Sequence, residues 1–315
     1  MIGGKPAEDV LMNTIYYDSA VSDDLRRSML YQGQLFVYAP RPSTIEFCTF
    51  ARQLIEEAFK GLDPRTAQDH IPVERYAQIL GELKPKFIHH PKSKASIQAL
   101  LREMGCDAGK TYFDVPRMRS STSGGYLTSG IAYAWHPHRD TWYSAPACQI
   151  NWWIPIYDIT SDNAMAFHPR YWAQAVRNDS FQYDYEEWNK HHRYAATQFI
   201  KEDPRPLPRA TEPIDLDPQV RLICPAGGVI LFSGAQMHSS VPNTSGHTRF
   251  SIDFRTVHLD DVMAFHGAPN IDASCTGTTM NDYLRGTDLE HVPQELVTQY
   301  RERALRSDRL PENVR

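Results

Sequence analysis

The sequence is poor in the features that mark several specialised classes of protein. Its 315 residues include only five cysteines, widely spaced and without a Cys-x-x-Cys pair, so we expect reduced thiols in a cytoplasmic protein. The net charge is −5 and no basic run alternates with aromatic residues, so nucleic acid is not an expected partner. No apolar run approaches the roughly 18 residues of a membrane span, and residues 1–9 lack a signal-peptide pattern. We therefore expect neither membrane association nor export.

The composition is typical of one globular domain. Hydrophobic residues make up 41% of the chain and charged residues 23%, which is sufficient for a sizeable core. We expect a single domain with a mostly helical flank at 1–110, a β-rich core at 111–258 that carries an insert at 171–220, and an extension at 259–315. The domain is expected to be a monomer or a homodimer.

Helical periodicity is concentrated near the two ends of the chain. A short strand is expected at 35–38, followed by a helix over 43–61 that opens with a Ser-Thr-Ile-Glu capping box. Two further helices are predicted around 73–83 and 96–104. Apolar residues at helical spacing between 296 and 305 predict an amphipathic helix that packs on the body or on a second subunit.

From residue 112 to 257 the pattern changes to short segments rich in Val, Ile, Tyr, Trp and Phe, separated by Gly, Pro and Asn. This spacing predicts a mainly β fold, a double-stranded β-helix or jelly roll with flanking α-helices. The polar, proline-rich insert at 171–220 is long for a connection in a compact domain. We therefore expect part of it to cover the mouth of a site.

The most informative chemical signal is the pair His138 and Asp140. Two residues apart on a β-strand, their side chains point the same way and can bind one metal ion. His238, which follows an apolar strand-like run and a turn, is the best candidate for a third ligand. Two imidazoles and one carboxylate leave three metal positions open, an arrangement that suits non-haem Fe(II) chemistry with oxygen.

Two other histidines compete with this assignment. His258 and Asp260 repeat the His-x-Asp spacing, but no comparable strand and basic residue follow them, so we interpret this pair as accidental. His136 offers a second imidazole beside His138, yet no carboxylate lies two positions after it. We interpret His136 as a pocket residue or as a contact of the metal ligands.

Three segments carry a resemblance to a known family. Residues 135–140 read Trp-His-Pro-His-Arg-Asp, residues 151–155 read Asn-Trp-Trp-Ile-Pro, and residues 238–249 run from a histidine through Ser-Ser-Val-Pro-Asn to an arginine. In this order they resemble the Trp-His-x-Asp iron motif (here stretched by two residues), the Trp-Ile-Pro-Leu strand and the distal-histidine and arginine segment of the phytanoyl-CoA dioxygenase family. The resemblance extends over about residues 20 to 258. At 163–169 the family's usual glycines are missing, so no particular substrate is implied.

The resemblance implies a cosubstrate site beside the metal site. Fe(II) would be bound by His138, Asp140 and His238, and the cosubstrates would be 2-oxoglutarate and O2. In the family, a basic residue eleven positions after the distal histidine binds the far carboxylate of 2-oxoglutarate, and a hydroxyl two positions after that histidine shares it. These positions are Arg249 and Ser240 here.

Other residues of the same strands are further candidates. Arg255 lies on the same strand face as Arg249 and is a rival anchor for the carboxylate. By the resemblance Trp153 lines the 2-oxoglutarate site, and strand parity places Gln149 and Asn151 on its face. Either Gln149 or Asn151 could hydrogen-bond to cosubstrate or substrate.

The implied activity is hydroxylation of an unactivated C–H bond in a small molecule, a biosynthetic intermediate or an amino-acid-like compound, with release of succinate and CO2. Desaturation, cyclisation and epimerisation on the same scaffold are alternatives. A zinc-dependent hydrolase and a non-catalytic small-molecule-binding protein are alternatives from other classes. Trp135, Trp142 and Tyr143 are candidates for contacts with an apolar or ring-bearing substrate.

Overall fold

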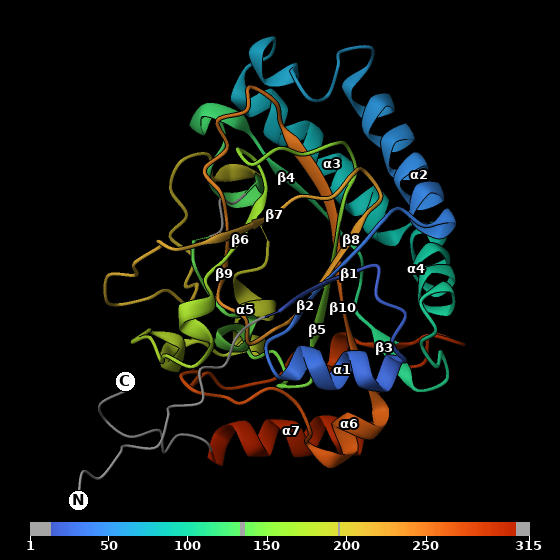
Figure 1. The fold of residues 1–315 in the computed structure, drawn as a ribbon. Coiled ribbons are helices and arrows are strands. Elements are labelled where there is room, and N and C mark those ends of the chain that lie inside the picture. The colour runs from blue at the N-terminus through green and yellow to red at the C-terminus, as the bar shows by residue number, and fades with distance from the viewer. Residues whose placement is uncertain (1–13, 133–135, 195, 307–315) are drawn as a thin grey trace, which may run out of the picture.

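The computed structural model describes residues 14–132, 136–194 and 196–306, and two β-sheets that face one another form its core (Figure 1). The larger sheet has the order β1-β2-β8-β5-β10-β3-β11, with β4 also paired to β10, and the smaller has the order β7-β6-β9. Only β1 and β2 pair in parallel among these strands. The predicted jelly roll with flanking helices is confirmed. The strands are β1 (Ile15–Tyr17), β2 (Leu35–Tyr38), β3 (Thr111–Phe113), β4 (Arg117–Ser121), β5 (Ile150–Pro155), β6 (Met165–Phe167), β7 (Val220–Leu222), β8 (Val229–Ser233), β9 (His238–Ser240), β10 (Arg249–His258) and β11 (Leu284–Arg285).

Alternate residues of the larger sheet enter two different cores. In β5, Trp152 packs in the core on the helix side, whereas Trp153 packs between the two sheets. In β8, Leu231 and Ile230 make the same division. Neighbouring residues of a strand point to opposite faces, so both faces of these central strands are buried. Burial on both faces explains why the sequences of β5 and β8 are almost continuously apolar.

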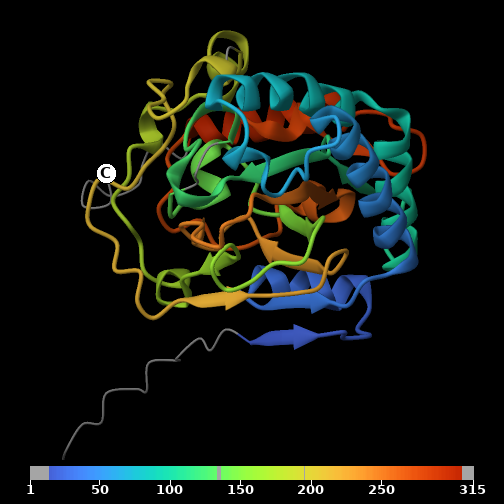
Figure 2. The ribbon, with the colours of Figure 1, turned by 90° about the horizontal axis from the view of Figure 1, so that it is seen from above.

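Helices α2 (Pro42–Phe59), α3 (Val73–His89) and α4 (Pro91–Glu103) cover the outer face of the larger sheet (Figures 1 and 2). The predicted capping box at Ser43 was wrong, because the N-cap of α2 is Arg41. The Arg41 N–H donates to Thr44 Oγ1 at 2.9 Å. Pro42 takes the first helical position, where its missing N–H and fixed φ angle are tolerated.

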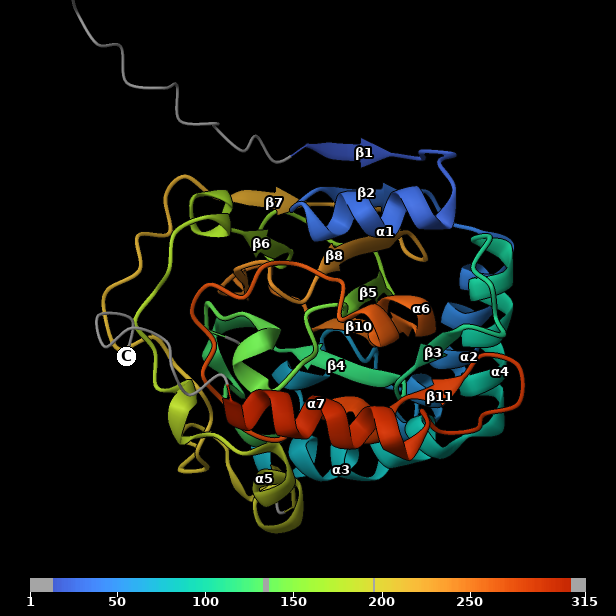
Figure 3. The ribbon, with the colours of Figure 1, turned by 90° about the horizontal axis from the view of Figure 1, so that it is seen from below.

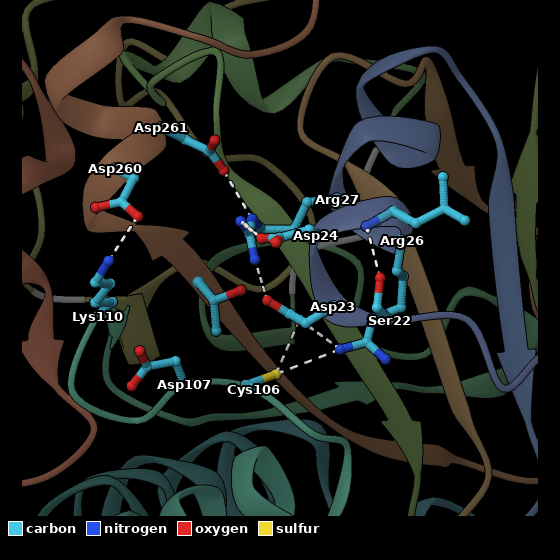
Figure 4. A network of polar contacts seen from close by, with 12 residues as sticks. Ser22, Asp23, Asp24, Arg26, Arg27, Cys106, Asp107, Lys110, Asp260 and Asp261 are labelled. Carbon is cyan, nitrogen blue, oxygen red and sulfur yellow. Dashed lines mark hydrogen bonds and ion pairs between the residues drawn. The ribbon is translucent and has the colours of Figure 1, made fainter.

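Helices α1 (Asp23–Tyr31), α6 (Leu259–Ala264) and α7 (Gln294–Arg306) lie together at one end of the sandwich (Figure 3). The amphipathic helix predicted between 296 and 305 is α7, and its Val297 is buried in the main core. An ion pair joins α1 to α6, in which Arg27 contacts Asp261 at 2.8 Å (Figure 4). Within α1, Arg27 also contacts Asp24 at 2.5 Å and pairs with Asp23.

The second His-x-Asp segment lies in this same region. Asp260 is exposed and pairs with Lys110 at 2.9 Å (Figure 4). His258 is buried at the start of α6, and no described carboxylate or imidazole joins it in a metal-binding group. This agrees with the interpretation of the segment as accidental.

The insert at 171–220 runs beside the smaller sheet (Figure 1) and contains α5 (Tyr185–His191), short 3-10 turns and long loops. It contributes several side chains to the cavity described below, among them Tyr183, Trp188 and Arg205. Among the described residues, no helix is long and apolar enough to cross a bilayer.

Candidate active site

His138 and His238 lie opposite one another in a single antiparallel bridge. The main-chain N–H of each donates to the carbonyl oxygen of the other at 3.0 Å, and the ring centroids are 4.3 Å apart. The expectation that His138 and Asp140 share a strand was wrong, because Asp140 begins a 3-10 turn (Asp140–Tyr143). The Asp140 N–H donates to the Gly234 carbonyl at 2.8 Å, which turns the chain there. The carboxylate nevertheless lies beside both imidazoles.

Both imidazoles are oriented by main-chain carbonyl groups. Nδ1 of His138 lies 2.7 Å from the His136 carbonyl oxygen, and Nδ1 of His238 lies 2.9 Å from that of Gln236. A ring nitrogen that donates its proton to a carbonyl leaves the other nitrogen, Nε2, available to a metal. His136 contacts His138 through its main-chain carbonyl group, and the residue itself is exposed to solvent.

Asp140 completes a compact group of three ligand atoms. Its Oδ1 is 3.5 Å from Nε2 of His138 and 3.9 Å from Nε2 of His238. All three residues are buried, and one ligand atom from each lies within 4.8 Å of the others. Two imidazole nitrogens and one carboxylate oxygen at this separation fit a divalent first-row metal ion.

The second oxygen of Asp140 is held by the protein. Oδ2 accepts hydrogen bonds from Gln149 Nε2 at 2.8 Å and from Asn151 Nδ2 at 2.7 Å, and Arg255 Nε lies 4.0 Å away. The Tyr283 hydroxyl donates to Gln149 Oε1 at 2.8 Å, and Gln149 Nε2 also donates to Asn151 Oδ1 at 2.9 Å. With Oδ2 engaged in this way, Oδ1 is the oxygen directed at the histidines.

The charge states suit metal binding. Burial raises the pKa of Asp140, but the hydrogen bond to His138 and the charge of Arg255 outweigh burial, so the pKa lies well below its usual range. Burial and the charge of His138 lower the pKa of His238 to about 3. At neutral pH the site therefore offers a carboxylate and a neutral His238 imidazole, the deprotonated forms that metals bind.

Arg249 lies at the start of β10 as a buried cation, with 7% of its surface exposed. Nη1 donates to the carbonyl oxygens of Asn163 and Ala164 at 2.8 and 3.2 Å, and Nη2 donates to Ser240 Oγ at 3.3 Å. The guanidinium carbon lies 5.4 Å from the ring centroid of Trp153. Burial lowers the pKa of Arg249 to about 10, so it remains protonated at neutral pH.

The charge of Arg249 has no counter-ion among the described residues. No carboxylate in that part of the chain forms an ion pair with it, and its Nε is buried without a hydrogen-bond partner. Ser240 follows His238 by two positions on β9, about 7 Å along a strand. The spacing between His238 and Ser240, the residue to which the Arg249 guanidinium donates, is therefore comparable to the length of a short dicarboxylate.

Arg255 is in a different electrostatic position. It pairs with Asp114 at 3.2 Å and Asp253 at 3.7 Å, and it lies near Asp140. Burial acts to lower its pKa, but these carboxylates raise it above the usual value. A guanidinium already neutralised by the protein is a poorer anchor for a cosubstrate carboxylate than Arg249.

A cavity of about 290 Å³ opens onto these residues. Tyr143 lines it, whereas Trp142 is fully buried and donates through Nε1 to Asp272 at 2.8 Å, so it packs away from the cavity. Trp135 lies outside the described residues. The seven residues predicted as metal ligands or cosubstrate contacts all line this cavity: His138, Asp140, Gln149, Trp153, His238, Ser240 and Arg249.

Several residues around the site were not found from the sequence. Arg139, which lies between His138 and Asp140 in the sequence, is 1% exposed and pairs with Asp272 at 3.0 Å. Tyr283 comes from the C-terminal extension, where no periodic pattern marks it. Lys84 lines the cavity from α3, and its place four residues after the buried Leu80 was the available signal.

Comparison with known proteins gives low-identity structural matches and no match to a curated protein. ThoJ, a non-haem monooxygenase, is 15% identical with a TM-score of 0.38, over 86% of this chain and 92% of that one. SnoN, an α-ketoglutarate-dependent epimerase from nogalamycin biosynthesis, is 14% identical with a TM-score of 0.35, over 75% and 84%. EvdO2 from Micromonospora carbonacea var. aurantiaca is 12% identical with a TM-score of 0.43, over 76% and 92%.

None of these TM-scores reaches 0.5, so the assignment of the chain rests on its sequence. The family model for phytanoyl-CoA dioxygenase matches residues 45–251, which is more than half of the chain. That range contains the buried group of His138, Asp140 and His238 and the unpaired charge of Arg249. The predicted resemblance is confirmed, and the chain belongs to the phytanoyl-CoA dioxygenase family of Fe(II)- and 2-oxoglutarate-dependent oxygenases.

Proposed function

We propose that His138, Asp140 and His238 bind Fe(II), and that Arg249 and Ser240 bind the far carboxylate of 2-oxoglutarate. The observation that carries the proposal is the buried guanidinium of Arg249, which lacks a carboxylate partner among the described residues and lies near two histidines and an aspartate within ligand distance of one another. A buried, uncompensated charge is costly, and a bound dicarboxylate would supply its counter-ion.

The roles of the neighbouring residues follow from their contacts. Trp153 faces the Arg249 guanidinium, so it closes one side of the cosubstrate slot. Gln149 has both amide protons donated, to Asp140 and to Asn151, so we assign it to positioning Asp140 and not to binding the cosubstrate directly. Fe(II) with 2-oxoglutarate and O2 supplies an oxidant for C–H bonds, and the products from the cosubstrate are succinate and CO2.

We propose hydroxylation of a small molecule as the reaction. Asp140 occupies the carboxylate position among the metal ligands, which leaves no vacancy for a halide. Desaturation, cyclisation and epimerisation share the same ligands and differ in how the substrate is placed. The family assignment replaces the hydrolase and binding-protein alternatives.

The proposal extends to the organisation of the chain. We take it as a single catalytic domain that acts without nucleic acid or membrane, as a monomer or homodimer. The five cysteines are unpaired and buried, which supports a reducing compartment such as the cytoplasm. Burial raises the pKa of four of them to about 12 or above, so they have little thiolate character: Cys48, Cys106, Cys148 and Cys224.

The test is anaerobic addition of Fe(II) and 2-oxoglutarate to the wild-type protein and to three variants, with the visible charge-transfer band of an iron-chelated keto acid as the readout. We expect the band in the wild type, its loss in Asp140→Ala, and a higher 2-oxoglutarate requirement in Arg249→Ala. Arg221→Ala is the matched control, because Arg221 is an exposed arginine on β7 that donates to the Ser161 carbonyl. Absence of the band in a folded, iron-loaded wild type would contradict the proposal.

A further inference from the structure

We propose that the substrate is a small organic anion whose carboxylate or phosphate group binds a basic wall formed by Lys84, Arg117 and Arg119. The inference rests on the function proposed above and concerns which molecule is oxidised. These three side chains line the same cavity as the metal ligands. Nothing in the roles of Fe(II) and 2-oxoglutarate requires them.

The charge lining the cavity is the first reason. The chain carries a net charge of −5, yet among the described residues seven cationic side chains line the cavity against four carboxylates. The charges of Fe(II), Asp140, 2-oxoglutarate and Arg249 cancel when all four are together. Of the cations that remain, Arg205 is neutralised by Asp203 at 2.5 Å. The others are Lys84, Arg117, Arg119, Arg193 and Arg255, and the remaining carboxylates are Asp114, Asp253 and Asp282.

The second reason is how these charges are paired. Asp253 is shared between Arg119 at 2.7 Å and Arg255 at 3.7 Å. Asp114 is likewise shared between Arg117 and Arg255. Among the described residues, two carboxylates thus form ion pairs with three guanidinium groups. An anionic substrate would supply the missing counter-charge where a neutral one would not.

Lys84 adds a fourth cation to this group. Its ammonium donates to the Ile131 carbonyl, and no carboxylate in the described part of the chain forms an ion pair with it. Burial and the charge of Arg119 lower its pKa to about 7, although Asp253 acts in the opposite direction. Lys84 is therefore a cation whose protonated form a bound anion would stabilise.

The basic wall is distinct from the cosubstrate slot. β10 pairs with β4 along one edge and with β5 along the other. Arg117 and Arg119 lie two residues apart on the same face of β4, opposite Asp253 and Ser251. Helix α3, which carries Lys84, contacts this strand (Figure 1). Trp153, by contrast, lies on β5, and Ser240 lies on the smaller sheet. Arg249 lies on β10 itself, opposite Ser121 of β4, so the basic wall continues from this residue along β4 toward α3. The two anion-binding groups share no residue.

The insert provides a surface for the body of such a substrate. Tyr183, Tyr185 and Trp188 line the cavity together with Tyr143. The indole N–H of Trp188 is buried and has no hydrogen-bond partner among the described residues. An apolar or ring-bearing body fits against these aromatic faces, and the Trp188 N–H is available to a polar group on it.

The test is fluorine NMR on the anaerobic enzyme loaded with Fe(II) and 2-oxoglutarate. The probes are para-fluorobenzoate, para-fluorophenyl phosphate and the neutral para-fluorobenzamide, which share one ring. We expect at least one anion to bind about tenfold or more tightly than the amide. Which anion binds better distinguishes a carboxylate from a phosphate substrate. Faster fluorine relaxation with Fe(II) than with Zn(II) would place the ring near the metal.

Variants then assign the binding to the wall. Lys84→Gln and Arg119→Gln should each weaken the anion about tenfold or more and leave the amide unchanged. Lys86→Gln is the matched control, since Lys86 lies on the same helix but is exposed and pairs with Glu57 at 3.2 Å. The charge-transfer band in every sample reports the state of the metal and cosubstrate site.

Three results would overturn the inference: no anion binding at millimolar probe, equal binding of the amide, or anion binding that neither variant weakens. Loss of the charge-transfer band in the wild type is a separate failure, because it contradicts the proposed function and not the presence of an anion site.

Discussion

The Gln149 amide donates a 2.8 Å hydrogen bond to Oδ2 of Asp140. Asn151 donates to the same oxygen, and the Tyr283 hydroxyl fixes the amide from its other side. Contacts within the protein therefore hold the carboxylate in one orientation, with Oδ1 directed at the two histidines. This arrangement makes the residues behind Asp140 determinants of metal affinity.

Replacing Gln149 with leucine should weaken Fe(II) binding by about tenfold to a hundredfold, because Asp140 loses one of the donors that orient it. The dissociation constant can be measured by competition with a chromophoric chelator under anaerobic conditions. Gln98→Leu is the control, since Gln98 donates to the Gly286 carbonyl and has no contact with the site. Unchanged Fe(II) affinity in Gln149→Leu would remove this residue from the positioning role.

Arg249 and Arg255 should differ in which binding step they affect. Arg249→Gln should raise KM for 2-oxoglutarate by about tenfold to a hundredfold, because the far carboxylate loses a charge-assisted hydrogen bond. Arg255→Gln should instead weaken Fe(II) binding, since Arg255 neutralises Asp114 and Asp253 and lies near Asp140. Steady-state succinate release at varied 2-oxoglutarate and varied iron separates the two. A larger KM effect in Arg255→Gln would make Arg255 the anchor.

Lys84 should give the protein a distinctive dependence of stability on pH. Its pKa is about 7 in the folded chain against an ordinary value of 10.5. Between these values the unfolded chain binds the extra proton, so this group makes the folded state more stable as pH rises and less stable as pH falls. In Lys84→Met that contribution disappears.

The stability of Lys84→Met relative to wild type should therefore fall by about 2 kcal/mol between about pH 6 and about pH 10, a figure reduced for the partial exposure of the side chain. Urea unfolding at both pH values measures the difference. A constant difference between the two proteins would mean that Lys84 titrates normally.

Arg139 should matter for stability and not for the chemistry. Its guanidinium pairs with Asp272 and donates to the carbonyl oxygens of Ala235 and Tyr171, all away from the metal ligands on either side of it. Arg139→Met leaves the Asp272 carboxylate buried without its cation, and we expect a loss of about 3–5 kcal/mol in unfolding free energy.

The control for Arg139 is Arg170→Met, which removes an exposed pair with Asp215 and should leave the unfolding midpoint unchanged. Chemical denaturation measures both variants. If Arg139→Met unfolds like the control, the buried pair contributes nothing to the fold.

The juxtaposition of His138, Asp140, His238 and Arg249 could be predicted because each residue belongs to a short motif with a fixed place relative to a strand. Trp153 was assigned by the resemblance to the family, and strand parity placed Gln149 and Asn151 on its face. The backbone conformation of residues 138–140 could not be predicted from the sequence. The turn at Asp140 depends on a hydrogen bond to Gly234, which lies far along the chain. The periodicity of apolar residues predicts that a strand is present. It does not predict where a hydrogen bond to a distant carbonyl group ends that strand.

The residues that escaped prediction share one property, which is long-range pairing. Gln149 and Tyr283 meet across 134 positions, and Arg139 and Asp272 across 133. No local pattern relates such residues, so Gln149 could be placed on the correct strand face while its partner remained unknown. The basic wall was missed for the same reason, because α3 and β4 meet only in the folded molecule.

The bridge between His138 and His238 joins two residues one hundred positions apart through their own main chains. The entropy lost in closing that long loop is therefore part of folding and not of metal binding. A metal that enters this site has to order little more than side chains. The protein should accordingly tolerate repeated removal and return of its iron without unfolding, and the ligand geometry should persist in the apoprotein.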